Sequence, residues 1–171
     1  MSGGGQIRIY VACLAAYNNG ILHGAWIDAE QDSSDIHDEI RVMLQASPIP
    51  EAEEWAIHDF EGFEGSEISE YEDIESVAEI AAFIAEHGAL GGKLLSYFDG
   101  LDEAREAMSE HYAGVYESVA DFARELTEQS TDIPQNLAYY IDYERMAHDL
   151  EINDVESIET GFEQVHIFWR H

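Results

Sequence analysis

The sequence is poor in basic residues: 7 Lys plus Arg stand against 37 Asp plus Glu, which gives a formal net charge of -30 at pH 7. Duplex DNA carries one negative charge per about 1.7 Å of its axis, so this charge equals that of roughly 50 Å of duplex. A surface of this sign repels a polyanion. The shortage of cations therefore argues against nucleic acid as a ligand.

The sequence also lacks a second cysteine and a long apolar run. Cys13 stands alone, which excludes an internal disulfide and suits a reducing compartment. No apolar run approaches eighteen residues, and no positively charged and apolar leader opens the chain. We therefore expect a cytoplasmic protein without a membrane partner.

Motifs for catalysis and metal binding are missing as well. Residues 87–94 resemble a phosphate-binding loop but carry His87 where Gly is required and Leu94 where Ser or Thr is required. No calcium loop occurs, and no two histidines stand four residues apart as on a zinc-binding helix. Cys13 and His23 lack a third residue that would orient them as nucleophile and base. Paired carboxylates could serve glycoside hydrolysis, but that requires two different environments. We expect no cofactor, no metal and no enzymatic activity.

What the sequence does contain is ample core material. Hydrophobic residues make up 46% of the chain and aromatics 11%, far more than in a disordered acidic tail. Alternating apolar residues predict strands at 6–13, 21–28 and 55–60. Asn-Gly favours a turn between the first two strands. A helix capped by Ser33 or Ser34 is predicted to end at 47–50 and to cover the sheet.

The residues that follow favour helices. Ser69 and Glu72 fit a capping box, and the helix that follows is predicted to end at Gly88. Phe83 falls near the charged side of this helix, so a neighbouring helix could cover the Phe83 side chain. Further helical segments are predicted at 89–100 and at 101–112, the latter ending near Gly114.

The last part of the chain favours a mixed unit. Ser118 can cap a helix at 119–128, and 132–135 interrupts the chain. Strands are predicted at 153–160 and 164–170. The fold class is therefore α+β, with three small consecutive domains. They are a sheet with a helix at 1–61, an all-helical domain at 62–103, and a mixed α+β domain at 104–171.

Carboxylates are densest in residues 51–79, and Glu86 follows downstream; residues 51–86 are here called the acidic segment. Residues 51–79 contain no Lys or Arg, so nothing nearby in the sequence neutralises them. Like charges three or four residues apart on a helix cost about 0.2–0.5 kcal/mol per pair. A solvated helix surface and adaptation to high salt are alternatives, but salt adaptation gives no reason for so dense a run. The candidate partner-binding carboxylates are Glu51, Glu53, Glu54, Asp59, Glu61, Glu64, Glu67, Glu70, Glu72, Asp73, Glu75, Glu79 and Glu86.

Long strings of this sequence resemble ArdA-type antirestriction proteins. They are RIYVACLAAYNNGILHGAWID, AIHDFEGF, YEDIESVAEIAAFI and DYERMAHDLEINDVESIETGFEQVHIFWRH, which together extend over nearly the whole chain. The resemblance implies an elongated three-part homodimer, carried on mobile genetic elements, that imitates bent B-form DNA. It also implies inhibition of type I restriction-modification enzymes by contact with their methyltransferase core.

A group of apolar residues near the end of the chain has two interpretations. Aromatic residues can form the domain core, or they can contact a partner, since they are favoured at interface centres. The resemblance implies that this region forms the dimer or a motif shared among antirestriction proteins. The residues are Leu137, Tyr139, Tyr140, Ile141 and Tyr143.

Two functions follow from these observations. The first is a protein that imitates DNA and occupies the DNA-binding channel of a type I enzyme. The second is an acidic, chaperone-like module that binds basic proteins, which needs only charge.

Overall fold

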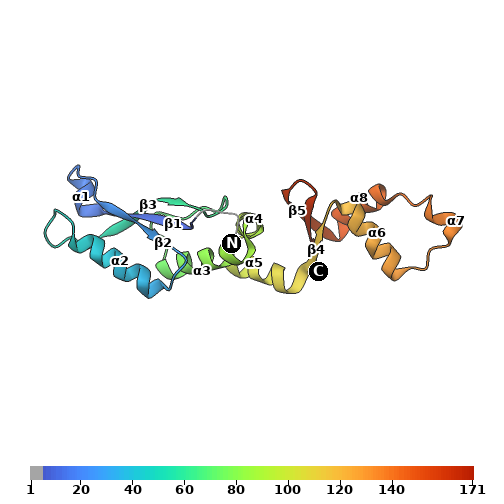
Figure 1. Ribbon diagram of the computed structural model, residues 1–171, viewed down its shortest axis with the longest axis horizontal. Coiled ribbons are helices and arrows are strands. Elements are labelled where there is room, and N and C mark those ends of the chain that lie inside the picture. Colours follow the sequence, from blue (N-terminus) through green and yellow to red (C-terminus); the bar gives the residue numbers. More distant parts are fainter. Residues whose placement is uncertain (1–5) are drawn as a thin grey trace. The chain divides into compact units, whose positions relative to one another are not determined.

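The computed structural model describes residues 6–171 and combines helices with two small antiparallel sheets, which confirms the α+β class. The chain divides into two compact units, residues 1–99 and 100–171. Each unit holds one of the sheets (Figure 1). An elongated shape and a division into three domains stay predictions.

The first sheet has the three predicted strands, β1 (Arg8–Cys13), β2 (Gly24–Asp28) and β3 (Trp55–Glu61). Their order is β2-β1-β3, and both pairings are antiparallel. Alternate β1 residues such as Ile9 and Val11 are fully buried, as expected for a sheet with one covered face.

Two helices accompany this sheet. The predicted turn after β1 contains a short helix, α1 (Leu14–Asn18), before Gly20 adopts a φ of 76°. α2 (Ser33–Gln45) lies along one face of the sheet (Figure 1) and buries Ile36, Ile40 and Met43 there. Its N-cap is Asp32 rather than either predicted serine.

The core of the first unit extends beyond the sheet. α3 (Ile74–His87) contributes Ile74, Val77, Ala81 and Ile84 to the same apolar cluster as the strands. α4 (Ala89–Tyr97) then packs against α3. Since the central helix and the sheet share one core, burial of apolar area stabilises them together.

The second unit begins with α5 (Leu101–Glu106), which passes into the π-helix η1 (Ala107–His111) and the strand β4 (Tyr112–Tyr116). The prediction of a helix that ends near Gly114 was therefore wrong at its end. Tyr112 pairs with Phe168 and Gly114 pairs with Ile167, so distant residues determine the conformation there.

The rest of the second unit follows the predicted order. α6 (Val119–Ser130) is capped by Ser118, whose Oγ accepts a hydrogen bond from the Asp121 N–H. α7 (Gln135–Ala138) and α8 (Tyr143–Asn153) follow, and α8 packs on α6. β5 (Val155–Gly161) and β6 (Gln164–Trp169) form a hairpin, and the sheet order is β4-β6-β5.

Two tyrosines of β4 make polar contacts. The Tyr112 hydroxyl lies 2.8 Å from Nδ1 of His166 on β6. The other ring nitrogen of His166 lies 3.1 Å from Thr160 Oγ1 on β5. Burial lowers the pKa of His166. The hydrogen bond that Tyr116 donates to Glu125, together with burial, raises the pKa of Tyr116 to about 12.

Candidate protein-binding surface

The structure places all the candidate carboxylates in the first unit, on consecutive elements. They lie in the turn before β3, on β3, on the connection between β3 and α3, and on α3. All are exposed except Glu72, which is half-buried. The acidic segment therefore presents its charges to solvent.

The connection between β3 and α3, residues 62–73, is tied to the core. Phe63 and Ile68 are buried in the same apolar cluster as the sheet, and the N–H of Ile57 donates to the carbonyl of Glu70 at 2.9 Å. Buried apolar side chains alternate with carboxylates along this connection. The carboxylates of Glu64 and Glu67 are thus held outward by an ordered backbone.

Two adjacent glycines let α4 approach its neighbours closely, Gly92 at this connection and Gly91 at α3. A Cβ on Gly92 would lie 2.2 Å from the backbone oxygen of Glu64, and one on Gly91 would lie 3.2 Å from the backbone of Ile84. Glu64 itself has a φ of 52°, a left-handed conformation that is uncommon for a residue with a side chain. Gly91 therefore allows α4 to pack closely on α3, and Gly92 allows it to pack closely on the connection.

α3 carries the remaining carboxylates on its exposed side. Glu75, Glu79 and Glu86 are exposed, while the opposite side of the helix is in the core. The predicted capping box was wrong: the helix begins at Ile74 with Asp73 at its N-cap. The Glu72 N–H instead donates to the Ser69 carbonyl, so Glu72 lies before the helix and not on it.

Phe83 is buried, with 4% of its surface exposed, and the centre of its ring lies 4.5 Å from that of the tilted His87 ring. The close approach of Gly91 of α4 to the backbone of Phe83 and Ile84 agrees with the expectation that a neighbouring helix covers this side of α3.

One member of the acidic segment is neutralised by an arginine. Arg8 Nε lies 2.6 Å from Glu61 Oε1, and the two residues face each other across β1 and β3. The Arg8 guanidinium also lies 4.9 Å from the centre of the Trp26 ring. No Lys or Arg lies near Glu61 in the sequence, and the cation that neutralises it comes from a distant strand.

Three further members lie beside histidines. His58 Nε2 is 3.6 Å from Glu70 Oε1, and His37 Nε2 is 3.6 Å from Glu75 Oε1. His87 Nε2 is 3.8 Å from Glu86 Oε2. These imidazoles come from β3, α2 and α3, and sequence reasoning gave them no role.

The aromatic group lies in the second unit, between α6 and α8. Tyr139 and Tyr140 are 90% and 79% exposed, and Leu137 is 52% exposed. The interpretation as domain core was therefore wrong for Tyr139 and Tyr140. Ile141 and Tyr143 are half-buried, and Arg124 stacks on the Tyr143 ring at 5.7 Å.

The segment that carries these tyrosines makes short-range backbone hydrogen bonds. The N–H groups of Leu137 and Ala138 donate to Pro134, and the N–H of Tyr140 donates to Leu137. In Figure 1, α7 lies on a loop that extends away from α6 and α8. This surface matches the aromatic composition of interface centres.

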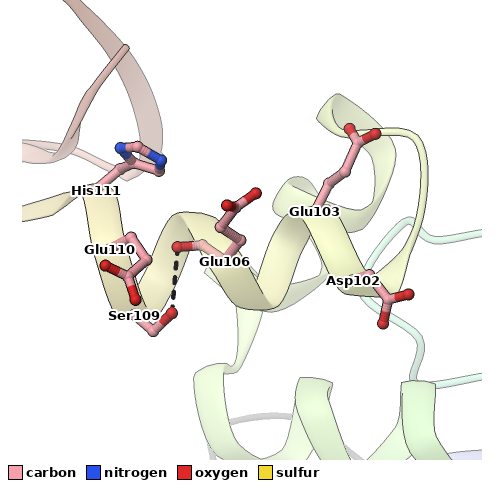
Figure 2. Close-up of a pocket in the computed structure, with 6 residues that line it drawn as sticks. All are labelled: Asp102, Glu103, Glu106, Ser109, Glu110 and His111. Carbon is pink, nitrogen blue, oxygen red and sulfur yellow. Dashed lines mark hydrogen bonds between the residues drawn. The ribbon is translucent and has the colours of Figure 1, made fainter. Parts of the chain in front are cut away.

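Sequence reasoning missed an acidic depression on α5 and η1 (Figure 2). It has a volume of about 560 Å³ and is open to solvent. Asp102, Glu106 and Glu110 recur every four residues there, a helical spacing that could have revealed it. The lining residues are Asp102, Glu103, Glu106, Ser109, Glu110 and His111.

The side chains of Cys13 and His23, considered above as nucleophile and base, have other contacts. Cys13 Sγ is buried and lies 3.3 Å from Ser47 Oγ, while the His23 ring contacts the carbonyl of Met43 at 2.7 Å. Within residues 6–171, no three His, Cys, Asp or Glu side chains are arranged to hold a metal ion. In the same part of the chain, no helix has the length and apolar character needed to cross a membrane.

Comparison with known proteins supplies the family. No curated protein matches the chain. The model of the antirestriction protein family ArdA, however, matches residues 9–164, a span that includes the whole acidic segment and the exposed tyrosines. This match confirms the resemblance drawn from the sequence, and the chain belongs to the ArdA family of antirestriction proteins.

Proposed function

We propose that this protein is a stoichiometric inhibitor that imitates B-form DNA and occupies the DNA-binding channel of a type I restriction-modification enzyme. The observation that supports this most directly is the exposure of the acidic segment on an ordered backbone. A channel that binds DNA presents Lys and Arg, which displace counterions from phosphates. Exposed carboxylates can engage the same cations.

Inhibition follows because the decoy lacks what the enzyme acts on. A carboxylate surface contains neither a phosphodiester bond to cleave nor a base to methylate, so the proposed inhibitor has no catalytic role of its own. Contacts to phosphates carry no base sequence. We therefore expect inhibition of type I enzymes whose target sequences are unrelated.

The active species in this proposal is a homodimer that binds the methyltransferase core. The exposed surface at Leu137, Tyr139 and Tyr140 supports an interface in the second unit. A two-fold axis would double the charge to about -60 and repeat the acidic segment symmetrically. This arrangement suits an enzyme that reads two separated half-sites.

The test is a restriction assay with a type I enzyme and its substrate DNA. We expect near-complete inhibition at a near-equimolar dose of protein and little effect on an unrelated basic DNA-binding protein. Inhibition should weaken as salt rises, because screening reduces the attraction between exposed charges. An affinity independent of salt would contradict the mechanism.

A charge-neutralised variant tests the surface itself. Six carboxylates of the connection and the start of α3 are replaced by their amides: Glu64, Glu67, Glu70, Glu72, Asp73 and Glu75. We expect inhibition to fall by at least tenfold while the melting temperature does not fall, since like-charge repulsion is removed.

The competing function is a chaperone-like module that holds basic proteins, which the overall charge also favours. Such a module would bind many cationic proteins with similar affinity. Equal binding to the type I enzyme and to the unrelated basic protein would therefore support this second function and contradict the first.

A further inference from the structure

One stretch of this acidic chain has no charged side chains. Residues 9–27 contain no Asp, Glu, Lys or Arg. Within them three large apolar side chains are exposed: Leu22 to 86%, Tyr17 to 53% and Ile21 to 39%. These three residues are here called the apolar turn. A single exposed apolar residue is ordinary on a protein surface, whereas several that gather in one place indicate contact with a partner.

The apolar turn has an ordered backbone. It closes the C-terminus of α1 as a Schellman motif, in which the N–H of Ile21 donates to the carbonyl of Ala16 at 2.9 Å and the N–H of Gly20 donates to that of Tyr17 at 3.0 Å. Gly20 adopts the left-handed φ of 76° that the motif requires. Because the fold already holds this backbone, a partner that covers the turn loses little affinity to ordering it.

The motif accounts for Ile21 but not for Leu22. An apolar residue commonly follows the left-handed glycine of a Schellman motif and packs back on the helix, and Ile21 holds that position. Leu22 comes one residue later, with most of its side chain in water. Leu22 therefore adds little to the burial that stabilises the first unit, and its side chain is accessible to a partner.

The apolar turn borders the acidic segment. α1 lies at one end of the first sheet (Figure 1), and the N–H of Leu14 donates to the carbonyl of Glu54 at 3.0 Å. The Tyr17 ring lies edge-on to the His58 imidazole of β3, with 4.9 Å between the ring centres. His58 in turn lies 3.6 Å from Glu70. Exposed carboxylates that precede and follow β3 therefore lie near the apolar turn.

Charge decides which partner fits this surface. A second copy joined at the apolar turn would bring its own acidic segment beside the first, and like charges that face each other across an interface oppose binding. A basic protein instead places Lys and Arg against the carboxylates and an apolar side chain against the turn. Such a contact has the usual anatomy of a protein interface, an apolar centre with a polar rim.

We propose that the apolar turn docks, with Leu22 as its anchor, on an apolar side chain that Lys and Arg flank on the DNA-binding surface of the inhibited enzyme. This inference rests on the proposed function for the identity of the partner. The contact adds affinity that salt does not screen, because the burial of apolar area does not depend on charge. It also gives the inhibitor a contact that the phosphates of DNA lack.

The test is Leu22→Ser, which removes the apolar side chain without changing the net charge. The dose that gives half-maximal inhibition of the type I enzyme is measured at several salt concentrations. The matched control is Ile152→Ser, which replaces an aliphatic residue of α8 that is 60% exposed in the second unit. The variant with six carboxylates replaced by amides supplies the comparison for charge.

We expect L22S to raise that dose about 10- to 100-fold at every salt concentration, as the loss of one buried leucine side chain does. The slope of the logarithm of the dose against the logarithm of the salt concentration should stay that of the wild type, whereas the six-amide variant should flatten it. I152S should follow the wild type. Leu22→Met keeps an apolar side chain and should lose less potency than L22S.

Several outcomes would overturn the inference. They are an unchanged dose for L22S, a changed salt slope for L22S, and a loss of potency in I152S or L22M as large as in L22S. Light scattering after size exclusion adds one more: a lower mass of L22S than of the wild type would show that a second copy covers the turn.

A second measurement separates this inference from the proposed function. Anisotropy follows the binding of two fluorescent decapeptides of equal charge, one that alternates Arg with Leu and one that alternates Arg with Ser. We expect the wild type to bind the Arg-Leu peptide more tightly and L22S to lose that preference. If the wild type does not inhibit the enzyme, the proposed function fails and the peptides decide. A preference lost in L22S then supports the apolar turn, and a preference that is retained in L22S or absent from the wild type overturns it.

Discussion

Arg8 and Glu61 form an ion pair across β1 and β3, although 53 residues separate them in the chain. The pair is partly exposed, and the Arg8 guanidinium also stacks on Trp26. Glu61 therefore holds β3 to its neighbour, whereas Glu70, Glu75 and Glu86 of the acidic segment lie beside imidazoles. One member of the segment contributes to stability rather than to repulsion.

This pairing predicts different effects on stability for two substitutions in the same segment. Glu61→Gln should lower the free energy of unfolding by about 0.5–1 kcal/mol, the range of a partly exposed pair. Glu67→Gln should leave it unchanged or raise it slightly. Urea denaturation at pH 7.5 measures both. Equal effects on stability would contradict a structural role for Glu61.

The spread of the acidic segment over several elements predicts redundancy in binding. Glu72→Gln removes one charge among many. We therefore expect the dose that gives half-maximal inhibition to change by less than about threefold, which is the change in affinity expected from the loss of one exposed ion pair. The restriction assay measures that dose. Abolished inhibition in a folded single variant would indicate one local docking site instead of a distributed surface.

Gly92 predicts an unusual response to alanine. In an ordinary helix interior, Gly→Ala stabilises by about 0.5–1 kcal/mol. Here the new Cβ would meet the backbone of Glu64 at 2.2 Å, so Gly92→Ala should destabilise by about 1–3 kcal/mol, as overpacking does.

Thermal and urea denaturation would show this loss of stability. Gly91→Ala is the matched control, because its nearest contacts are 3.2 Å away. We expect a smaller loss for G91A than for G92A, and a gain of stability in G92A would contradict the close approach.

His166 predicts how the second unit responds to acid. Burial lowers its pKa below the ordinary value of 6.5, so the unfolded state binds more protons than the folded state as the pH falls below 6.5. The stabilising contribution is complete above that pH and is lost as the pH falls through the lowered pKa of the folded state.

The measurement compares urea denaturation of the wild type and His166→Gln between pH 7.5 and 5. The free energy of unfolding of the wild type should fall relative to that of H166Q across this interval. Parallel curves would show that the imidazole between Tyr112 and Thr160 does not titrate differently on folding.

The exposed tyrosines predict where the proposed dimer forms. Tyr139→Asp together with Tyr140→Asp should weaken dimerisation at least 100-fold, because central aromatic residues can contribute about 2 kcal/mol or more each. Light scattering after size exclusion measures the mass. The control is Phe162→Asp, which changes an aromatic side chain that is 89% exposed in the β5–β6 turn. Dissociation by F162D alone would place the interface elsewhere.

The elements predicted best were those with strong local signals. The alternation in β1 and the helical spacing of Ile36, Ile40 and Met43 are properties of neighbouring residues, so sequence reasoning found them. The strand β4 was missed because Tyr112 continues a helical pattern. Its extended conformation depends on pairing with Phe168, which no local pattern reports.

The sequence by itself determined the net charge, the density of carboxylates in residues 51–86 and the family resemblance, because composition and motifs do not depend on folding. Tertiary structure decided what each carboxylate does. Burial of Phe63 and Ile68 holds the connection in place, Arg8 neutralises Glu61 from another strand, and three imidazoles lie beside other members. Such contacts join residues distant in the chain, and only packing brings them together.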